Sequence, residues 1–390
     1  MLRQFFFHDL FEKVAEGREY FASGLKAMVG TMNKKTFDLL DQDSTDIFLH
    51  PMLFSYLNAD TTQINCDQIL YGSIKEADRP QSIAVMANDF GEIYMPGIGY
   101  LETGIPHKEH YILVTTKNEM KILKDKKVIP YRIKRNPVIA GTNIELQCRS
   151  NYLTDIHLPG KNLYAGNYKN AKAINEAVSI LKKYYPEFFS LFTAVTKYIV
   201  PFNHPGANSF ALLGMHGTAF INTHLGKGVV FFLEDIVHQC GHIIFSTITY
   251  KPADYFNVDP QTPISGITND GNDDRTLYVL FHGIFTEALM CEAFDICIEN
   301  KVFKPGEDHE LRGRLCYILL RFIMDMQIMG SIKCFSEKGQ VIYDEIYKSM
   351  ASMYKKYGAM LKTFNLENQP YNFDFSKFRK INPQYRESCL

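Results

Sequence analysis

The apolar string FFLEDIVHQCGHIIF, residues 231–245, constrains the fold more than any other feature of the sequence. It is interrupted by His238 and His242, and on a helix this four-residue spacing places both imidazoles on one face, about one turn apart. Two ring nitrogens in that arrangement can bind one metal ion. The alternative is a pair of hydrogen-bonded core histidines, because an HxxxH pattern also occurs by chance. The apolar surroundings favour the metal, since buried imidazoles need partners.

A second apolar segment, RTLYVLFHGIFTEAL at residues 275–289, supplies the predicted third ligand, His282. Arg275, Tyr278 and His282 fall on one stripe of the expected helix. Glu287 is the alternative ligand. It is rotated well away from His282, so we expect only one of these two side chains to face the site. We favour His282 because the acids of this helix do not reproduce the ligand spacing of gluzincin peptidases.

The residue that follows His238 separates two kinds of metal chemistry. A zinc peptidase with an HExxH motif uses its glutamate to take a proton from metal-bound water and return it to the leaving amine. This chain has Gln239 there, and an amide cannot accept that proton, although it can hold water or substrate by hydrogen bonds. We therefore expect a metallopeptidase-like fold without the ordinary peptidase mechanism, with Gln239 as a candidate catalytic-site residue in another role.

Residues 208–290 resemble the HExxH-motif family that is found beside ribosomally made peptides and is assigned to 2-oxoglutarate-dependent peptide β-hydroxylases. The matching pieces are NSFALLGMHGTAFIN, EDIVHQCGHIIF and DDRTLYVLFHGIF. In the last piece, Arg275 and His282-Gly283 follow the family's Arg…His-Gly spacing. The helix, proline break and helix of residues 171–201 are also similar. The resemblance covers roughly the C-terminal half of the chain.

The resemblance implies a metallopeptidase-like scaffold that holds Fe(II) through His238, His242 and His282 and leaves positions open for 2-oxoglutarate and O2. Zn(II) could occupy the same ligands in the isolated protein. The implied reaction is hydroxylation at Cβ of a residue in a ribosomally synthesised precursor peptide. It needs no general base, so it tolerates Gln239 where the family has glutamate. Two alternatives remain: a zinc hydrolase with an unconventional base, and an inactive relative that only binds a peptide.

An enzyme that uses 2-oxoglutarate must bind the distal carboxylate of this molecule, and the fork of an arginine suits it. The candidates are Arg275, on the stripe described above, Arg321, which should be buried within CYILLRFIM, and Arg314, seven residues earlier on the same helical face. Tyr278 is a further candidate for the cofactor site. Each arginine could instead form a structural ion pair, and the acids considered for this are Asp235, Glu234 and Asp325.

The rest of the chain predicts an α+β fold in two parts. Residues 1–78 are mostly helical in pattern, and residues 81–147 contain short β-branched or aromatic runs that indicate an antiparallel meander. Turn residues at Pro159-Gly160 and Gly166-Asn167 mark a boundary. We therefore expect a mixed helical and β-rich region over residues 1–160, which helps to bind a peptide. A mainly helical metal-binding catalytic domain should follow over residues 161–390.

The expected elements can be stated by range. The strands are expected at 83–86, 92–95, 111–115, 128–133 and 143–147, with one or two more within 208–222. The helices are expected at 171–185, 188–200, 226–248, 275–299, 310–329 and 340–361. His216 and His224 flank the strand before the metal helix, and we expect them to face substrate or to be structural.

Composition excludes several classes of protein. The formal net charge is -1 and the pI is about 6.9, which gives no electrostatic basis for binding nucleic acid. The 8 cysteines form no CxxC pair, which predicts reduced thiols in a cytoplasmic protein. The first residues have acids within their apolar run, unlike a signal peptide, and no apolar run is long enough to span a bilayer. We expect a soluble protein without a membrane partner.

Overall fold

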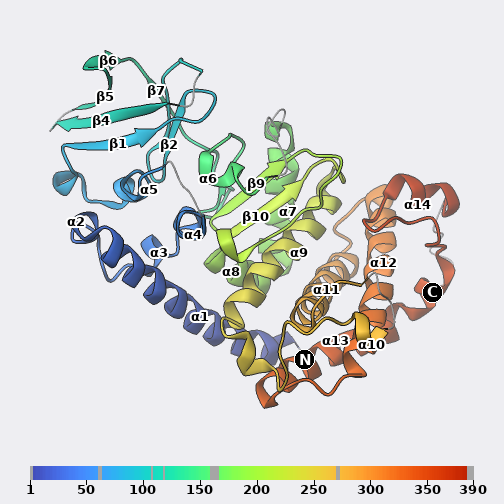
Figure 1. The fold of residues 1–390 in the computed structure, drawn as a ribbon. Coiled ribbons are helices and arrows are strands. Elements are labelled where there is room, and N and C mark those ends of the chain that lie inside the picture. The colour runs from blue at the N-terminus through green and yellow to red at the C-terminus, as the bar shows by residue number, and fades with distance from the viewer. Residues whose placement is uncertain are drawn as a thin grey trace.

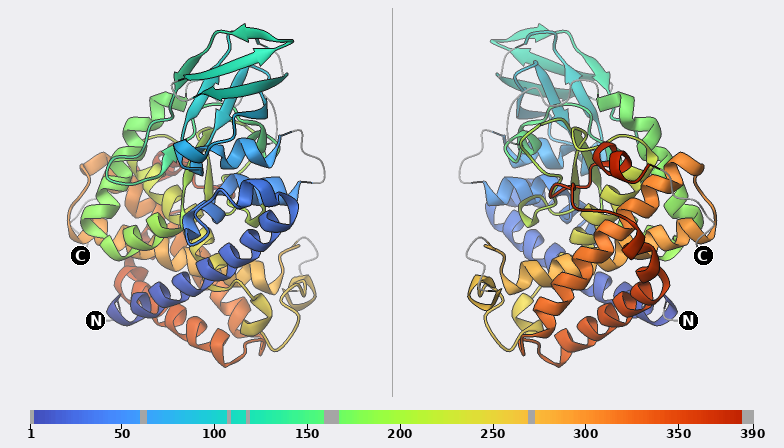
Figure 2. Two further views of the ribbon diagram at one scale, coloured as in Figure 1. Left: turned by 90° about the vertical axis from the view of Figure 1, so that its left-hand side faces the viewer. Right: turned by 90° about the vertical axis from the view of Figure 1, so that its right-hand side faces the viewer.

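The computed structural model describes residues 3–59, 64–106, 109–116, 119–158, 167–268 and 273–383. Over these residues the chain is a mixed α+β protein, with the sheets in the N-terminal part and middle and, apart from the N-terminal helix, the long helices toward the C-terminus (Figure 1). The side views show the antiparallel strands at one end of the molecule and the C-terminal helices at the other (Figure 2). The predicted fold class is confirmed at this level.

The N-terminal part begins with the long helix α1 (Arg3–Met32). Four short helices follow: α2 (Lys34–Phe37), α3 (Thr45–Phe48), α4 (Pro51–Asn58) and α5 (Cys66–Leu70). Two buried residues of α1, Leu10 and Val14, belong to the core of the C-terminal helices, whereas Leu25 and Val29 belong to a second core with α4 and α5. This one helix therefore ties the two ends of the molecule together.

The β-rich region consists of two antiparallel sheets, with strand orders β1-β4-β5-β6 and β2-β3-β7. Its strands are β1 (Ser82–Met86), β2 (Glu92–Met95), β3 (Gly99–Glu102), β4 (His110–Thr116), β5 (Glu119–Lys124), β6 (Lys127–Ile129) and β7 (Arg132–Lys134). The antiparallel pairing agrees with the prediction. The single strand predicted at 128–133 is wrong, because Pro130 has no N–H for a ladder and separates β6 from β7, which join different sheets.

A third sheet is parallel, with the order β10-β9-β8, and lies in the middle of the molecule. It consists of β8 (Glu145–Leu146), β9 (Tyr198–Phe202) and β10 (Thr218–Asn222). The helix predicted to reach Val200 is wrong, since α8 (Pro186–Val195) ends earlier and β9 follows. Pro201 disfavours a helical Val200, and pairing with β10 supplies the alternative. Every residue of β9 is buried, as expected of a central parallel strand.

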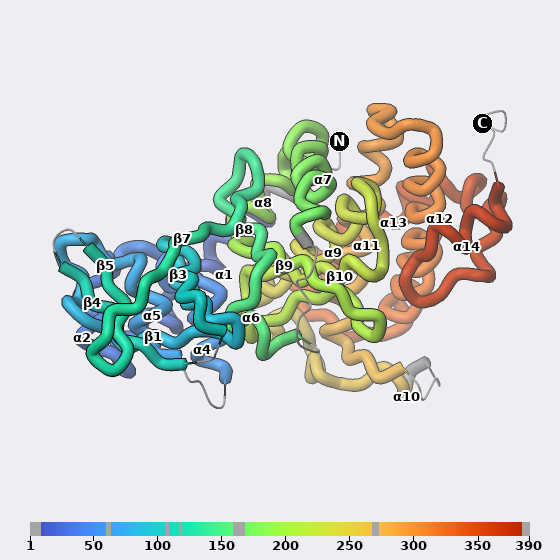
Figure 3. Tube along the Cα trace, turned by 90° about the horizontal axis from the view of Figure 1, so that it is seen from above, coloured from blue at the N-terminus to red at the C-terminus, as the bar shows by residue number. Residues whose placement is uncertain are grey.

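The remaining helices form the C-terminal part. Apart from the short helix α6 (Tyr152–Asp155), which packs against α4, they are α7 (Ala171–Tyr184), α9 (Val229–Ile248), α10 (Ser265–Thr268), α11 (Leu277–Glu299), α12 (Pro305–Gly330), α13 (Glu337–Thr363) and α14 (Phe375–Ile381). Seen from above, α7, α9, α11 and α12 follow one another across this part (Figure 3). Arg275, predicted to lie in the second apolar helix, precedes α11, whose N-cap is Thr276.

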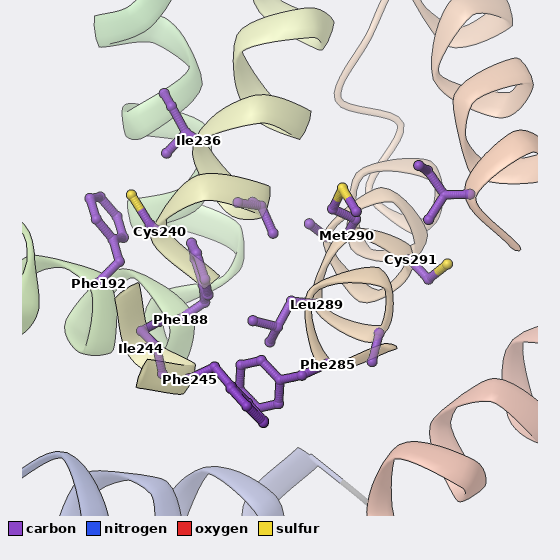
Figure 4. Packing of buried hydrophobic residues seen from close by; sticks show 14 of the residues in the cluster. Phe188, Phe192, Ile236, Cys240, Ile244, Phe245, Phe285, Leu289, Met290 and Cys291 are labelled. Carbon is purple, nitrogen blue, oxygen red and sulfur yellow. The ribbon is translucent and has the colours of Figure 1, made fainter. Parts of the chain in front are cut away.

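The two helices that carry the histidines, α9 and α11, are antiparallel and pack closely. Gly241 of α9 faces α11, where a Cβ would lie 3.1 Å from Thr286 and 3.2 Å from Leu289. One turn later, the ring of Phe245 contacts Phe281, His282 and Phe285. Figure 4 shows this seam, with Cys240 on the opposite side of α9 near Phe192. Cys240 is therefore turned away from the seam.

Two helices, α9 and α11, are long and apolar enough to cross a membrane by length and composition, contrary to the expectation that no run would be. However, 78% and 72% of their most apolar windows are buried inside the molecule. A helix surrounded by protein on all sides can be as apolar as one surrounded by lipid, and this explains the composition. The burial is consistent with a soluble protein.

The predicted division near residue 160 cannot be placed, because residues 159–166, which include Pro159-Gly160 and Gly166, lie outside the described residues. Strand β8, from the N-terminal side of that division, pairs with β9 on the other side. Of the 8 cysteines, the seven within the described residues are free and buried, and Cys389 lies outside them.

Candidate metal centre

His238 and His242 lie side by side on α9, as their spacing predicts. Their Nε2 atoms are 3.0 Å apart, and burial, more than any nearby charge, lowers the pKa of His238 to about 3 and that of His242 well below its usual range. Two metal–nitrogen bonds of about 2.1 Å at right angles would place the nitrogens about 3.0 Å apart. The pair therefore fits two adjacent ligand positions, and the same distance also fits one hydrogen bond between the rings.

His282 lies next to the pair, but its Nε2 is engaged. The centroid of its ring is 4.2 Å from that of His242, and its Nε2 donates to the backbone oxygen of His242 at 2.9 Å. Burial lowers its pKa to about 4. Among the residues that the structure describes, no three His, Cys, Asp or Glu side chains are arranged to hold a metal ion. Ligation through Nε2 would need the ring to turn away from that carbonyl, whereas ligation through Nδ1 would keep this hydrogen bond, and the role of His282 as third ligand remains a prediction.

A cavity of about 300 Å³ opens in front of the pair, between α9, α11, α12 and the segment after α13. We call it the charged cavity, because its lining includes the ionisable side chains of Glu234, Asp235, Arg275, Glu287, Arg314, Arg321 and Asp325. His238, His242 and His282 also line it. The expectation that only one of His282 and Glu287 would face the site is wrong. Gly283 lies between them and has no side chain, so the cavity extends around α11 and reaches both.

Glu287 is the most weakly paired buried acid in this cavity. One carboxylate oxygen is 3.8 Å from Nε of Arg321, and the other is buried with no hydrogen-bond partner. Burial, followed by the charge of Asp325, raises its pKa well above the usual range. An unpartnered buried oxygen needs a proton, a donor or a cation. Glu287 therefore remains the alternative third ligand.

The three candidate arginines all line the charged cavity but differ in their partners. Arg275 forms a bidentate pair with Asp325 at 2.7 and 3.1 Å and contacts Asp273. Arg314 lies between Glu234 at 3.0 Å and Glu310 at 2.7 Å. Both are thus the structural ion pairs considered as alternatives.

Arg321 is the least occupied arginine of the three. The expectation that it would be buried is wrong: its side chain is 32% exposed, whereas that of Arg314 is 4% exposed. Its contacts are Glu287 at 3.8 Å, the backbone oxygen of Tyr371 at 3.5 Å, and the rings of Tyr371 and Tyr317. Its charge is also close enough to contribute to the low pKa of His238.

Gln239 reaches a buried polar group behind His238. Its Nε2 is 3.2 Å from Oδ1 of Asp235 and 3.3 Å from Nδ1 of His238, while its Oε1 has no hydrogen-bond partner. Asp235 also accepts a hydrogen bond from Ser209, and burial raises the pKa of Asp235 to about 7. From the sequence, Asp235 was expected only as a possible ion-pair partner of an arginine. Its position one turn before Gln239 was the available signal for this contact.

Tyr278 does not join the arginines, contrary to its assignment to the cofactor site. Its hydroxyl bonds Thr249 Oγ1 at 2.9 Å, and it lines a second cavity of about 280 Å³ on the other side of His242 and His282. The prediction that Arg275 and Tyr278 share one face of the helix is wrong, because Arg275 precedes α11 and its side chain points in another direction. His216, expected to face substrate or to be structural, lines this second cavity, whereas His224 is exposed.

Comparisons with known proteins add no identity. No model of a protein family matches the chain, and a search of curated proteins found no similar sequence.

Proposed function

We propose that this protein is an Fe(II)- and 2-oxoglutarate-dependent dioxygenase that hydroxylates a residue of a ribosomally synthesised peptide. The observation that carries the proposal is the pair of buried, neutral imidazole nitrogens, 3.0 Å apart, in the wall of a cavity that also contains a half-exposed arginine. The resemblance of residues 208–290 to peptide β-hydroxylases selects this chemistry among the reactions that such a site could support.

In this proposal His238 and His242 hold the metal, with His282 or Glu287 as the third ligand. Either set leaves coordination positions open. Bound Fe(II) would supply the oxygen chemistry, in which 2-oxoglutarate loses CO2 and takes one atom of O2 to become succinate. The other atom of O2 would be inserted into a C–H bond of the substrate. No step of this reaction requires a protein base, so a glutamine at position 239 is compatible with it.

Gln239 would act as a positioning residue. Ligation through Nε2 leaves the proton of His238 on Nδ1, and the amide can turn to present its oxygen to that proton. A ligand histidine commonly has its second nitrogen held in this way, which fixes the orientation of the ring. In that orientation the amide oxygen also faces Oδ1 of Asp235, so this carboxyl, which accepts a hydrogen bond from Ser209, would have to carry its proton, as its raised pKa allows.

Arg321 would bind the distal carboxylate of 2-oxoglutarate. Arg275 and Arg314 already have carboxylate partners at 2.7–3.1 Å, so a ligand would have to compete with them. Arg321 offers most of its donors to the cavity, and replacement of its 3.8 Å contact with Glu287 would cost little.

The test is anaerobic loading with Fe(II), followed by O2, 2-oxoglutarate and a candidate precursor peptide. We expect succinate release and a mass gain of one oxygen atom on the peptide. Before turnover, His242→Ala should weaken Fe(II) binding more than about 100-fold, since loss of a ligand exceeds the usual effect of its supporting residues. His216→Ala, which removes another buried imidazole, is the matched control and should retain the metal.

Two outcomes would overturn the proposal. In the first, His242→Ala binds Fe(II) and 2-oxoglutarate as well as the unaltered protein does. In the second, the zinc form gains proteolysis from Gln239→Glu while 2-oxoglutarate has no effect, which would establish a hydrolase.

A further inference from the structure

The second cavity lies against the same histidines as the charged cavity but has a different lining. We call it the neutral cavity, because the described residues that line it include no Asp, Glu, Lys or Arg. Its apolar and aromatic walls come from α1, the segment before β10, α9 and α11, and include Phe21, Leu212, Leu213, Ile243, Tyr250 and Tyr278. Its volume of about 280 Å³ is close to that of the charged cavity.

Several polar groups of the neutral cavity are already paired within the protein. Tyr278 bonds Thr249 at 2.9 Å, and Ser246 donates to the backbone oxygen of His242 at 3.0 Å. His216 lies 3.1 Å from the hydroxyl of Thr247 and packs against Phe21, and burial lowers its pKa to about 4. An ion entering this cavity would lose its water shell without meeting an opposite charge, which is costly. An uncharged ligand meets no such cost.

Among the residues that the structure describes, three line both cavities: Ala211, His242 and His282. His242 belongs to the proposed metal pair and His282 is a candidate for the third ligand, so a molecule in the neutral cavity lies beside His242. The hydrogen bond from His282 to the backbone of His242 is part of this dividing wall.

We propose that the neutral cavity receives an uncharged, mainly apolar side chain of the peptide substrate and holds it beside the metal, opposite the 2-oxoglutarate side. This inference rests on the proposed function. The size agrees, because a dry cavity of about 150 Å³ already admits a benzene ring. One aromatic or branched aliphatic side chain would fill most of the space, with Tyr250 and Tyr278 at its edges.

Indole is a suitable probe, because it is neutral and the chain contains no tryptophan, so its fluorescence is observed against tyrosine alone. The metal-free protein should bind indole at least tenfold more tightly than the anion indole-3-acetate. Two exposed apolar residues offer matched obstructions: Leu213, 54% exposed, lines the neutral cavity, and Val279, 47% exposed, lines the charged one.

The two obstructions should have opposite effects, measured by calorimetry. Leu213→Trp should raise the dissociation constant of indole at least tenfold and change that of 2-oxoglutarate less than twofold. Val279→Trp should do the reverse. In Leu213→Trp the introduced indole is the only one in the chain, so blue-shifted emission verifies that it has entered the cavity. Absence of indole binding, tighter binding of indole-3-acetate, or loss of indole binding only in Val279→Trp would overturn the proposal.

A paramagnetic ion tests the position of the ligand relative to the histidines. With Co(II) bound, the proton resonances of indole should broaden strongly, and with diamagnetic Zn(II) they should not. Unbroadened resonances of bound indole in a Co(II)-loaded protein would contradict the placement. If the metal fails to bind while indole still occupies the neutral cavity, the proposed dioxygenase function falls and the neutral binding site remains. If Fe(II) and 2-oxoglutarate produce succinate without indole binding, the opposite holds.

Discussion

The charged cavity and the neutral cavity have nearly the same volume and share His242 and His282, yet one is lined by acids and arginines and the other by neutral side chains. In the charged cavity, burial raises the pKa of both Asp235 and Glu287, so the protein is destabilised wherever these carboxyls must ionise. The neutral cavity contains no such group among its described lining residues. In the two proposals, His242 and His282 therefore lie between two ligands of unlike chemistry.

The charges of the first cavity are also arranged unequally. Arg275 and Arg314 are held by carboxylates, and Arg321 is nearly unpaired. The paired arginines therefore contribute mainly to stability, and the unpaired one is available to a ligand. Substitutions that separate stability from ligand affinity can test this contrast between the two cavities.

The largest expected effect is a loss of protein stability when an ion pair of the charged cavity is broken. Arg314→Met should lower the free energy of unfolding by about 3–5 kcal/mol, because it leaves Glu234 and Glu310 without their buried partner. Urea unfolding at neutral pH would measure it. The matched change Arg312→Met on the same helix, outside the cavity lining, should cost less. An equal loss of stability in both variants would show that the ion pairs of Arg314 stabilise the protein no more than an ion pair outside the cavity does.

The next effect is a pH dependence that arises from Asp235. The pKa of its carboxyl is about 7 in the folded chain against 3.8 as the ordinary value, so the folded state binds the extra proton between these two pH values. The stability contributed by this proton is present below pH 3.8 and is lost as the pH rises toward 7. Asp235→Asn removes this titrating group. As the pH rises, the free energy of unfolding of the variant should increase relative to that of the unaltered protein, by at most about 4 kcal/mol at pH 8.

Unfolding of the metal-free protein at pH 5 and pH 8 gives the measurement. The control is Asp254→Asn at a half-exposed residue. The stability difference between this variant and the unaltered protein should change by less than about 1 kcal/mol between the two pH values. A stability difference between Asp235→Asn and the unaltered protein that is the same at both pH values would contradict the assignment.

Arg321→Gln should act on affinity rather than on stability. Loss of a charge-assisted contact of about 1.5–3 kcal/mol corresponds to a rise of about 10- to 100-fold in the dissociation constant of 2-oxoglutarate. Calorimetry on the Fe(II)-loaded protein without O2 would measure this, with Arg312→Gln as the control. Indole affinity should stay within twofold, because Arg321 does not line the neutral cavity. If Arg321→Gln left 2-oxoglutarate binding unchanged, the least-paired arginine would not be its site.

The sequence predicted the parts of this site that depend on local spacing. His238 and His242 face one another because they lie on one helix, and the apolar character of α9 was evident in the sequence. The proximity of His282 followed from a second buried helix. The helical repeat determines which side chains share a face of one helix, and the apolar character of both helices favours their packing together.

The burial of the arginines depends on distant segments and could not be predicted. Arg314 and Arg321 share a helical face, but Arg314 is covered by Phe231 of α9 and by Phe373, which follows α13. Arg321 instead lies beside the rings of Tyr317 and the exposed Tyr371, which leave it partly open to solvent. The helix expected through Val200 failed for a similar reason, since β9 is stabilised by strands on both sides that are distant in sequence.

The smallest expected effect distinguishes the two cavities most directly. Tyr278→Phe removes the hydrogen bond to Thr249 and should cost about 0.5–1.5 kcal/mol of stability. The loss is limited because the Thr249 hydroxyl keeps its own acceptor, the backbone oxygen of Phe245 at 2.6 Å. Since Tyr278 lines the neutral cavity, 2-oxoglutarate affinity should stay within twofold, while indole binds equally well or better. A tenfold loss of 2-oxoglutarate affinity in this variant would return Tyr278 to the cofactor site and remove the boundary between the cavities.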